Sequence, residues 1–178
     1  MTLIDSSTGV EVSRSAGGGI DREEAAAVLA FLESDEAMRL AAMGRVKQWN
    51  PGETVIEGHR PADFLAFVLD GKLAVKKPAS FPGRYVLLAE IERGGMAGEA
   101  AVVDLAGGPG CSSDSGGPAC YGTVVEAVEP SRLLVLPRER LRGLIEDDQG
   151  LALKLLVRIV KVMRQRLRGA GERLAWIL

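Results

Sequence analysis

Residues 94–103 read Gly-Gly-Met-Ala-Gly-Glu-Ala-Ala-Val-Val, and they follow a strand-like run at residues 85–91. Glycine allows the backbone to turn sharply and to come close to a ligand. The residues after Gly98 have the composition of a short helical turn, and Glu99 stands at its start. Free N–H groups at a helix start favour an anion, and a carboxylate accepts hydrogen bonds. This stretch is therefore the first candidate for a ligand-binding segment.

The segments around this stretch have the pattern of short strands joined by turns. Residues 49–58 read WNPGETVIEG, and residues 64–73 read FLAFVLDGKL, with Asp-Gly between two apolar runs as a hairpin signal. Residues 123–127 read TVVEA, and residues 133–141 read LLVLPRERL, in which a proline precedes a helical pattern. Short strands at a spacing of about ten residues predict a small roll or barrel.

Taken together and in this order, the five segments resemble the cyclic nucleotide-binding domains of the catabolite activator protein (Crp/Fnr) family. Residues 94–103 resemble the phosphate-binding cassette of that family, and the whole resemblance covers about residues 36–168. It implies a mainly β fold with flanking helices, built on a β-roll of about eight strands (a double-stranded β-helix or jelly roll) and a C-terminal dimerisation helix. It also implies a ligand-sensing regulatory module that is not an enzyme.

The resemblance implies roles for four consecutive residues of the cassette. Gly98 would shape the turn, and Glu99 would accept hydrogen bonds from a ribose. The backbone amides of Ala100 and Ala101 would face the phosphate. The implied ligand is a cyclic nucleotide, cAMP or cGMP, and no other cofactor is expected.

The cassette departs from the family pattern at its arginine. A gapless match through the strand at residues 123–127 places the family's arginine on Tyr121, the neighbouring small hydroxyl residue on Gly122, and the start of the strand on Thr123. Residues 94–131 contain no Lys or Arg. Loss of one partner of a buried charge pair costs about 2–5 kcal/mol. We therefore expect weak cyclic-nucleotide binding, unless a basic side chain of the C-terminal helix supplies the charge, with Arg158 and Lys161 as the candidates.

The predicted organisation has four parts. Residues 1–20 form a disordered tail, and residues 21–44 form helices that begin with Asp21 as a cap. Residues 45–137 form the roll, and residues 138–178 form the C-terminal helices. A mobile insertion, rich in Gly, Ser and Pro, interrupts the roll at residues 105–119.

The last helix carries apolar residues at spacings of three and four, which is typical of a coiled-coil seam. The seam comprises Leu153, Leu156, Val160, Met163, Leu167, Ala170, Leu174 and Ile177. Two interpretations remain open: the seam joins two copies of the chain as a homodimer, or it packs on its own roll.

Composition and charge restrict the classes of function that the chain can have. With 47% hydrophobic and 26% charged residues, the chain is typical of a globular protein, and no apolar run is long enough to span a membrane. No secretory signal is present, so we expect a cytoplasmic protein. Residues 132–178 hold 11 basic and 5 acidic side chains, which form either a solvated helix face or a surface for an anionic partner. No DNA-binding pattern follows the last helix.

No catalytic or metal-binding constellation is present in the sequence. His59 is the single histidine. Cys111 lies in the insertion and Cys120 directly follows it, and the two are free thiols, a loop-closing disulfide or a redox pair. Three functional hypotheses remain. The first is a ligand sensor. The second is a ligand-free module for dimerisation or for an effector protein, with nucleotide binding lost. The third, a transcription factor, would need a DNA-binding domain on another chain.

Overall fold

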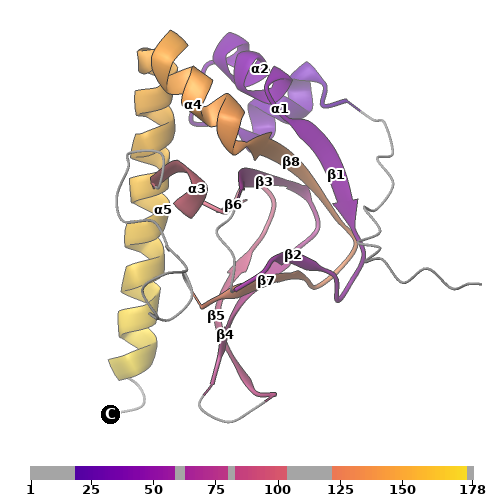
Figure 1. The fold of residues 1–178 in the computed structure, drawn as a ribbon, viewed down its shortest axis with the longest axis vertical. Helices are drawn as coiled ribbons and strands as arrows, with labels where there is room; N and C mark the ends of the chain where they lie inside the picture. The colour runs from indigo at the N-terminus through magenta and orange to yellow at the C-terminus, as the bar shows by residue number, and fades with distance from the viewer. Residues whose placement is uncertain (1–18, 59–62, 80–82, 104–121, 176–178) are drawn as a thin grey trace, which may run out of the picture.

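The computed structural model describes residues 19–58, 63–79, 83–103 and 122–175 (Figure 1). The predicted N-terminal tail lies outside these residues except for its last two positions. The insertion at 105–119, His59, Cys111, Cys120 and Tyr121 lie outside them as well.

Two short helices precede the roll, α1 (Arg22–Val28) and α2 (Ser34–Ala42). The Asp21 carboxylate accepts a hydrogen bond from the Glu24 amide at 2.8 Å, which confirms the predicted cap. A capping box formed by Glu33 and Glu36 begins α2. Both helices pack on one face of the roll with apolar side chains that include the fully buried Leu29 and Leu40.

Eight strands form two antiparallel four-stranded sheets, with the orders β1-β8-β3-β6 and β2-β7-β4-β5. The strands are β1 (Arg45–Trp49), β2 (Thr54–Ile56), β3 (Phe64–Asp70), β4 (Leu73–Pro78), β5 (Tyr85–Ile91), β6 (Met96–Ala97), β7 (Val124–Ala127) and β8 (Ser131–Pro137). This arrangement with its flanking helices confirms the predicted β-roll. The Asp-Gly turn is confirmed, since Gly71 lies between β3 and β4 with a φ of 89°. The predicted hairpin is wrong, because the chain crosses at this turn from one sheet to the other and β3 and β4 do not pair.

The central strands β3 and β8 separate two hydrophobic cores. Because side chains alternate along a strand, Leu65 and Phe67 of β3 face the helices, whereas Ala66 and Val68 face the second sheet. β8 alternates in the same way, and Leu65 lies opposite Leu136 in the pairing of the two strands. One sheet therefore supports the helices on one side and closes the roll on the other.

Two helices follow the roll, α4 (Arg138–Asp147) and α5 (Gln149–Ala175). Pro137 is the last residue of β8 and the cap of α4, not its first helical residue. Leu141 and Leu144 are buried, but Ile145 is 40% exposed, because the short helix turns only part of its apolar face inward. None of the helices that the structure describes is long and apolar enough to cross a membrane.

The long helix α5 stands along one side of the molecule and has two apolar faces (Figure 1). Leu151, Leu155 and Ile159 are each 2% exposed and pack against the other helices and the first sheet. The predicted seam faces outward instead: Val160 is 63% exposed and Leu167 is 76% exposed. The interpretation that this seam packs on its own roll is therefore wrong, since a second stripe of the helix takes that place. The side chains of Ala170, Leu174 and Ile177 are outside the described part.

Candidate functional site

The candidate cassette is fixed along β3 at one edge of the first sheet. The Gly94 amide donates a hydrogen bond to the Val68 carbonyl at 2.9 Å, and the Val68 amide donates to the Gly95 carbonyl at 3.0 Å. The short strand β6 then continues along β3, with Ala97 opposite Ala66. This backbone ladder places the residues that follow β6 at one end of the roll.

The backbone at position 98 leaves no room for a side chain, so a glycine is needed there. Its φ is 80°, a conformation that other residues rarely adopt. A Cβ atom at this position would lie 2.3 Å from the carbonyl oxygen of Phe64. The close approach lets the backbone cross β3 and deliver Glu99 to the start of α3 (Ala100–Val103).

Glu99 is held by a side chain from the last helix. One guanidinium nitrogen of Arg166, on α5, lies 2.5 Å from a Glu99 carboxylate oxygen. Its second terminal nitrogen donates a hydrogen bond to the carbonyl of Met96. The Glu99 and Arg166 side chains are 23% and 26% exposed, so the pair is partly shielded from solvent. A charge-assisted contact of this kind is stronger than a hydrogen bond between neutral groups.

The amide of Ala101 is already engaged. It donates a hydrogen bond to the Gly98 carbonyl at 2.9 Å, and the amide of Val102 donates to the Glu99 carbonyl at 3.1 Å. This differs from the expectation that the Ala101 amide faces a phosphate, because the turn after Gly98 closes on itself. A ligand would have to compete with that internal bond, and Ala101 is also completely buried.

The structure brings the two parts of the predicted site to the same end of the roll, on either side of the end of β2. A Cβ at Gly98 would lie 3.4 Å from a methyl group of Ile56, the last residue of β2. Two residues later, a Cβ at Gly58 would lie 3.3 Å from the Thr123 carbonyl. Gly122 has a φ of 52° and leads directly into Thr123 and β7. The position of Tyr121 is outside the described residues.

Among the described residues, the basic side chain that pairs with Glu99 is that of Arg166, not that of Arg158 or Lys161. Arg158 donates instead to the Gly94 carbonyl at 3.3 Å, and Lys161 is exposed. Arg166 continues the buried stripe of Leu155, Ile159 and Val162 at the same spacing of three and four. That second stripe is the signal in the sequence that could have identified Arg166 as facing the roll.

The described residues contain no group of three metal-ligating side chains that could hold an ion. The described polar side chains at the start of α3 include the Glu99 carboxylate and the Arg166 guanidinium. This set can bind hydroxyl groups and an anion.

Comparison with known proteins supports the fold and the family. The sequence model of the cyclic nucleotide-binding domain family matches residues 46–148, more than half of the chain. No curated protein sequence matches the chain. A cyclic nucleotide-binding domain from Methylobacillus flagellatus KT superposes with a TM-score of 0.72 at 17% identity, over 88% of this chain and 85% of that one.

Two regulatory proteins share the fold at similarly low sequence identity. The Thermus thermophilus catabolite activator protein gives a TM-score of 0.62 at 21% identity, over 84% of this chain and 62% of its own. The sensor domain of the transcriptional regulator DNR from Pseudomonas aeruginosa gives 0.56 at 18% identity, over 83% and 89% of the two chains. Identities this low show a shared fold. The family match and the β-roll together establish that the chain belongs to the family of cyclic nucleotide-binding domains.

Proposed function

We propose that the chain is a non-enzymatic regulatory sensor module. Its cassette takes a cyclic nucleotide or a related small anion, and α5 receives the signal. The observation that carries this proposal is the ion pair between Glu99 and Arg166. It joins the segment that would hold the ligand to the helix that would transmit its presence.

Ligand binding would exchange the partners of both side chains. Ribose hydroxyls would donate to the Glu99 carboxylate, which now accepts from Arg166. The released guanidinium would meet the phosphate, whose oxygens fit its planar fork of donors. Arg166 would thus supply the charge that Tyr121 cannot, and each binding event would change how α5 is attached to the roll.

The same exchange accounts for a modest expected affinity. Arg166 must leave Glu99 before it can serve a phosphate, so part of the interaction energy replaces a contact that already exists. A cassette that keeps its own arginine has no such competition. The loss of a buried charge partner, about 2–5 kcal/mol, corresponds to an affinity lower by roughly 30- to 5,000-fold.

We further propose that the outward face of α5 joins two copies of the chain. Its apolar side chains are exposed and follow the coiled-coil spacing. They are Leu153, Leu156, Val160, Met163 and Leu167. Contiguous exposed apolar surface of this kind is typical of an interaction site. In a dimer, a change at Arg166 would reach the partner through the same helix.

A second candidate function is a ligand-free interaction module. Two observations favour it: residues 94–131 contain no basic side chain, and the Ala101 amide is engaged internally. In this case the Glu99–Arg166 pair is a structural tether that fixes α5 permanently. The outward face of α5 would then serve dimerisation or an effector protein without a ligand.

Titration calorimetry with cAMP, cGMP and cyclic di-GMP separates the two functions. We expect weak binding of one of these ligands by the wild type, and a further loss of at least about tenfold in Arg166→Gln. Arg164→Gln removes the same charge from an exposed position of the same helix and should leave the affinity unchanged. Absence of binding at millimolar ligand would favour the ligand-free module. Submicromolar binding that survives Arg166→Gln would show that another group supplies the charge.

Tyr121→Arg offers an independent check on the cassette. It restores the residue that the family has at the aligned position and should strengthen cAMP or cGMP binding by at least about tenfold. Glu99→Ala in that background should weaken binding again. If Tyr121→Arg has no effect, the assignment of Tyr121 to the arginine position is wrong.

A further inference from the structure

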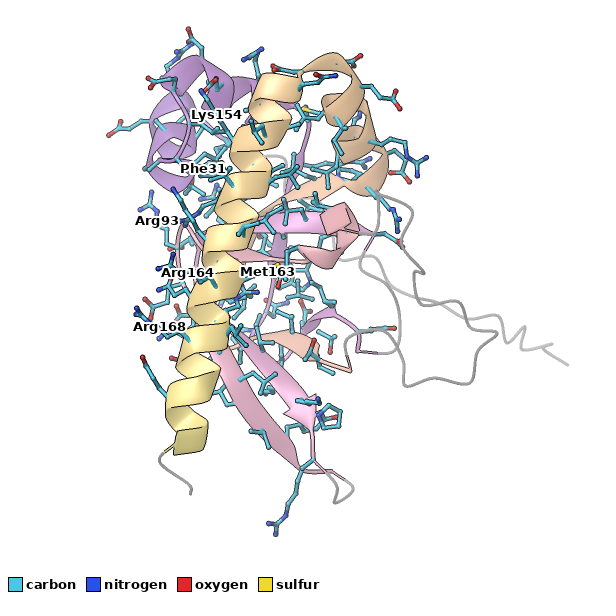
Figure 2. The ribbon with its side chains drawn as sticks, turned by 90° about the vertical axis from the view of Figure 1, so that its left-hand side faces the viewer. Phe31, Arg93, Lys154, Met163, Arg164 and Arg168 are labelled. Carbon is cyan, nitrogen blue, oxygen red and sulfur yellow. The ribbon has the colours of Figure 1, made fainter. Side chains whose placement is uncertain are left out.

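A concave site lies beside α5, next to the first residues of the cassette: Gly94, Gly95 and Met96 line it, together with Arg166. It is a cleft of about 770 Å³ between α1, the end of β5 with the turn that follows it, and α5. None of residues 98–101 lines it. In Figure 2, Phe31, Arg93 and Arg168 lie on one side of α5, and Met163 of the outward face lies on the other. The cleft therefore remains open if the outward face is covered.

In the part of the chain that the structure describes, four arginines line this cleft, and two of them have no carboxylate partner. Arg166 pairs with Glu99, and Arg168 lies 3.6 Å from Glu172. Among the described residues, no carboxylate lies within ion-pair distance of Arg93 or Arg158.

The acidic side chains at the β5 end of the cleft have another partner. Lys72 lies 3.0 Å from Glu92 and 4.0 Å from Glu90. The hydrogen bond from Lys72 to Glu92 raises the pKa of that lysine, which keeps it charged. The two unpaired guanidinium groups therefore leave a local excess of positive charge inside the cleft.

Arg158 also has fewer hydrogen-bond acceptors than its guanidinium group can use. A guanidinium has five N–H donors. One terminal nitrogen donates to the Gly94 carbonyl at a long 3.3 Å, and the guanidinium carbon lies 5.8 Å from the centre of the Phe31 ring. Its Nε atom is buried without a hydrogen-bond partner among the described residues. A charged group with so few acceptors carries a desolvation cost that a nearby anion would offset.

We propose that this cleft binds a small polyanion of the diphosphate class. Arg93 lies on the turn after β5, whereas Arg158 and Arg168 lie on α5. An anion with two linked charged groups can contact both elements at once, which a single carboxylate cannot do. The cleft volume is within the range of small-molecule sites.

The acidic rim argues for a compact anion. Glu90, Glu92 and Glu172 border the same cleft. They would repel the extended phosphate backbone of a nucleic acid, which carries charge along its whole length. A diphosphate seated among the arginines remains farther from them. Bound there, it would bridge the roll to α5 and favour the docked position of that helix.

Titration calorimetry with inorganic pyrophosphate at constant ionic strength tests this site. We expect saturable binding of one pyrophosphate per chain, with affinity lower by about tenfold or more in Arg93→Gln. Arg93 is exposed, so this variant should fold normally. Arg158→Gln should weaken binding as well. Arg164→Gln, with the same loss of charge outside the cleft, should bind as the wild type does.

Three outcomes would overturn the proposal. The first is an absence of saturable binding at millimolar pyrophosphate. The second is equal weakening by Arg93→Gln and Arg164→Gln, which would indicate general charge attraction only. The third is displacement of the pyrophosphate by a single-stranded oligonucleotide at lower concentration, which would assign the surface to nucleic acid. Retention of binding in Glu99→Ala supports a site separate from the turn at residues 98–101, and loss in that variant contradicts it.

Discussion

The two halves of α5 attach to the rest of the chain by different chemistry. The first half buries Leu151, Leu155 and Ile159 in the main core. The second half reaches the roll through the partly buried Val162 and through Arg166, whose partners are one carboxylate and one carbonyl.

Apolar packing and polar contacts respond differently to a ligand. A dissolved ligand cannot replace the contacts that an apolar side chain makes in a close-packed core. A ligand can offer the same hydrogen-bonding groups that Arg166 now uses. The difference indicates that the first half of α5 is a fixed anchor and that the second half is the part a ligand can release.

The largest expected effect is a loss of folding stability on substitution in the first half of α5, the fixed anchor. Leu155→Ala should lower the free energy of unfolding by about 2–5 kcal/mol, because it leaves a cavity in the main core. Leu156→Ala, one position along, removes the same atoms from an exposed site and should change the stability by less than about 1 kcal/mol. Urea denaturation in dilute protein measures both. Equal losses would mean that the two faces of α5 are not distinct.

The outward face should control assembly. The wild type should sediment as a dimer at tens of micromolar, and Val160→Asp should dissociate it, because an unpaired charge in an apolar interface is costly. Gln165→Asp introduces the same side chain at an exposed position on another face of α5 and should leave the dimer intact. A wild type that sediments as a monomer would rule out this interface.

A smaller effect should appear in the second half of α5 alone. Arg166→Gln removes the charge that binds Glu99, so local opening of the helix should become easier by about 1–2 kcal/mol, given partial exposure. Amide hydrogen exchange should accelerate in residues 163–172 and stay unchanged in residues 151–159. Arg164→Gln is the matched control. Faster exchange along the whole helix would remove the distinction between anchor and releasable half.

The smallest expected effect is on how the stability of the fold depends on pH. A hydrogen bond from Lys154 to Glu36 holds the pKa of that carboxyl below its ordinary value of 4.5. A lowered pKa contributes stability above the unfolded value and loses it as the pH falls through the folded one. Lys154→Met should therefore lower the urea midpoint slightly at pH 6 but not at pH 3. A difference that persists in acid would show that packing, and not the charge pair, links α5 to α2.

The sequence predicted the elements that depend on local patterns. Short apolar runs separated by turn signals predicted the strands, and Asp21 was identified as a cap. Asp-Gly predicted the turn at Gly71 but not that its two strands belong to different sheets. The outward face of α5 was found from its heptad spacing. These features depend on neighbours within a few residues, so the sequence contains them directly.

Less of the candidate site could be predicted from the sequence. Glu99 was identified, but its partner Arg166 lies 67 residues away on another element. The choice among the basic residues of α5 depends on how the helix is rotated, which its buried stripe decides. The internal bond of the Ala101 amide depends on how tightly the turn at Gly98 closes. The cleft beside α1 joins three distant segments and has no motif of its own.

The sheet order has a consequence for biosynthesis. Among the described strands, β1 pairs only with β8, and β8 also pairs with β3. During translation, β1 and β3 emerge long before their common neighbour, and their pairing edges stay open until β8 leaves the ribosome. Such edges and uncovered apolar surface make a nascent chain prone to aggregation. The roll should therefore close late in synthesis, and shielding by chaperones should matter most for chains that have not yet produced β8.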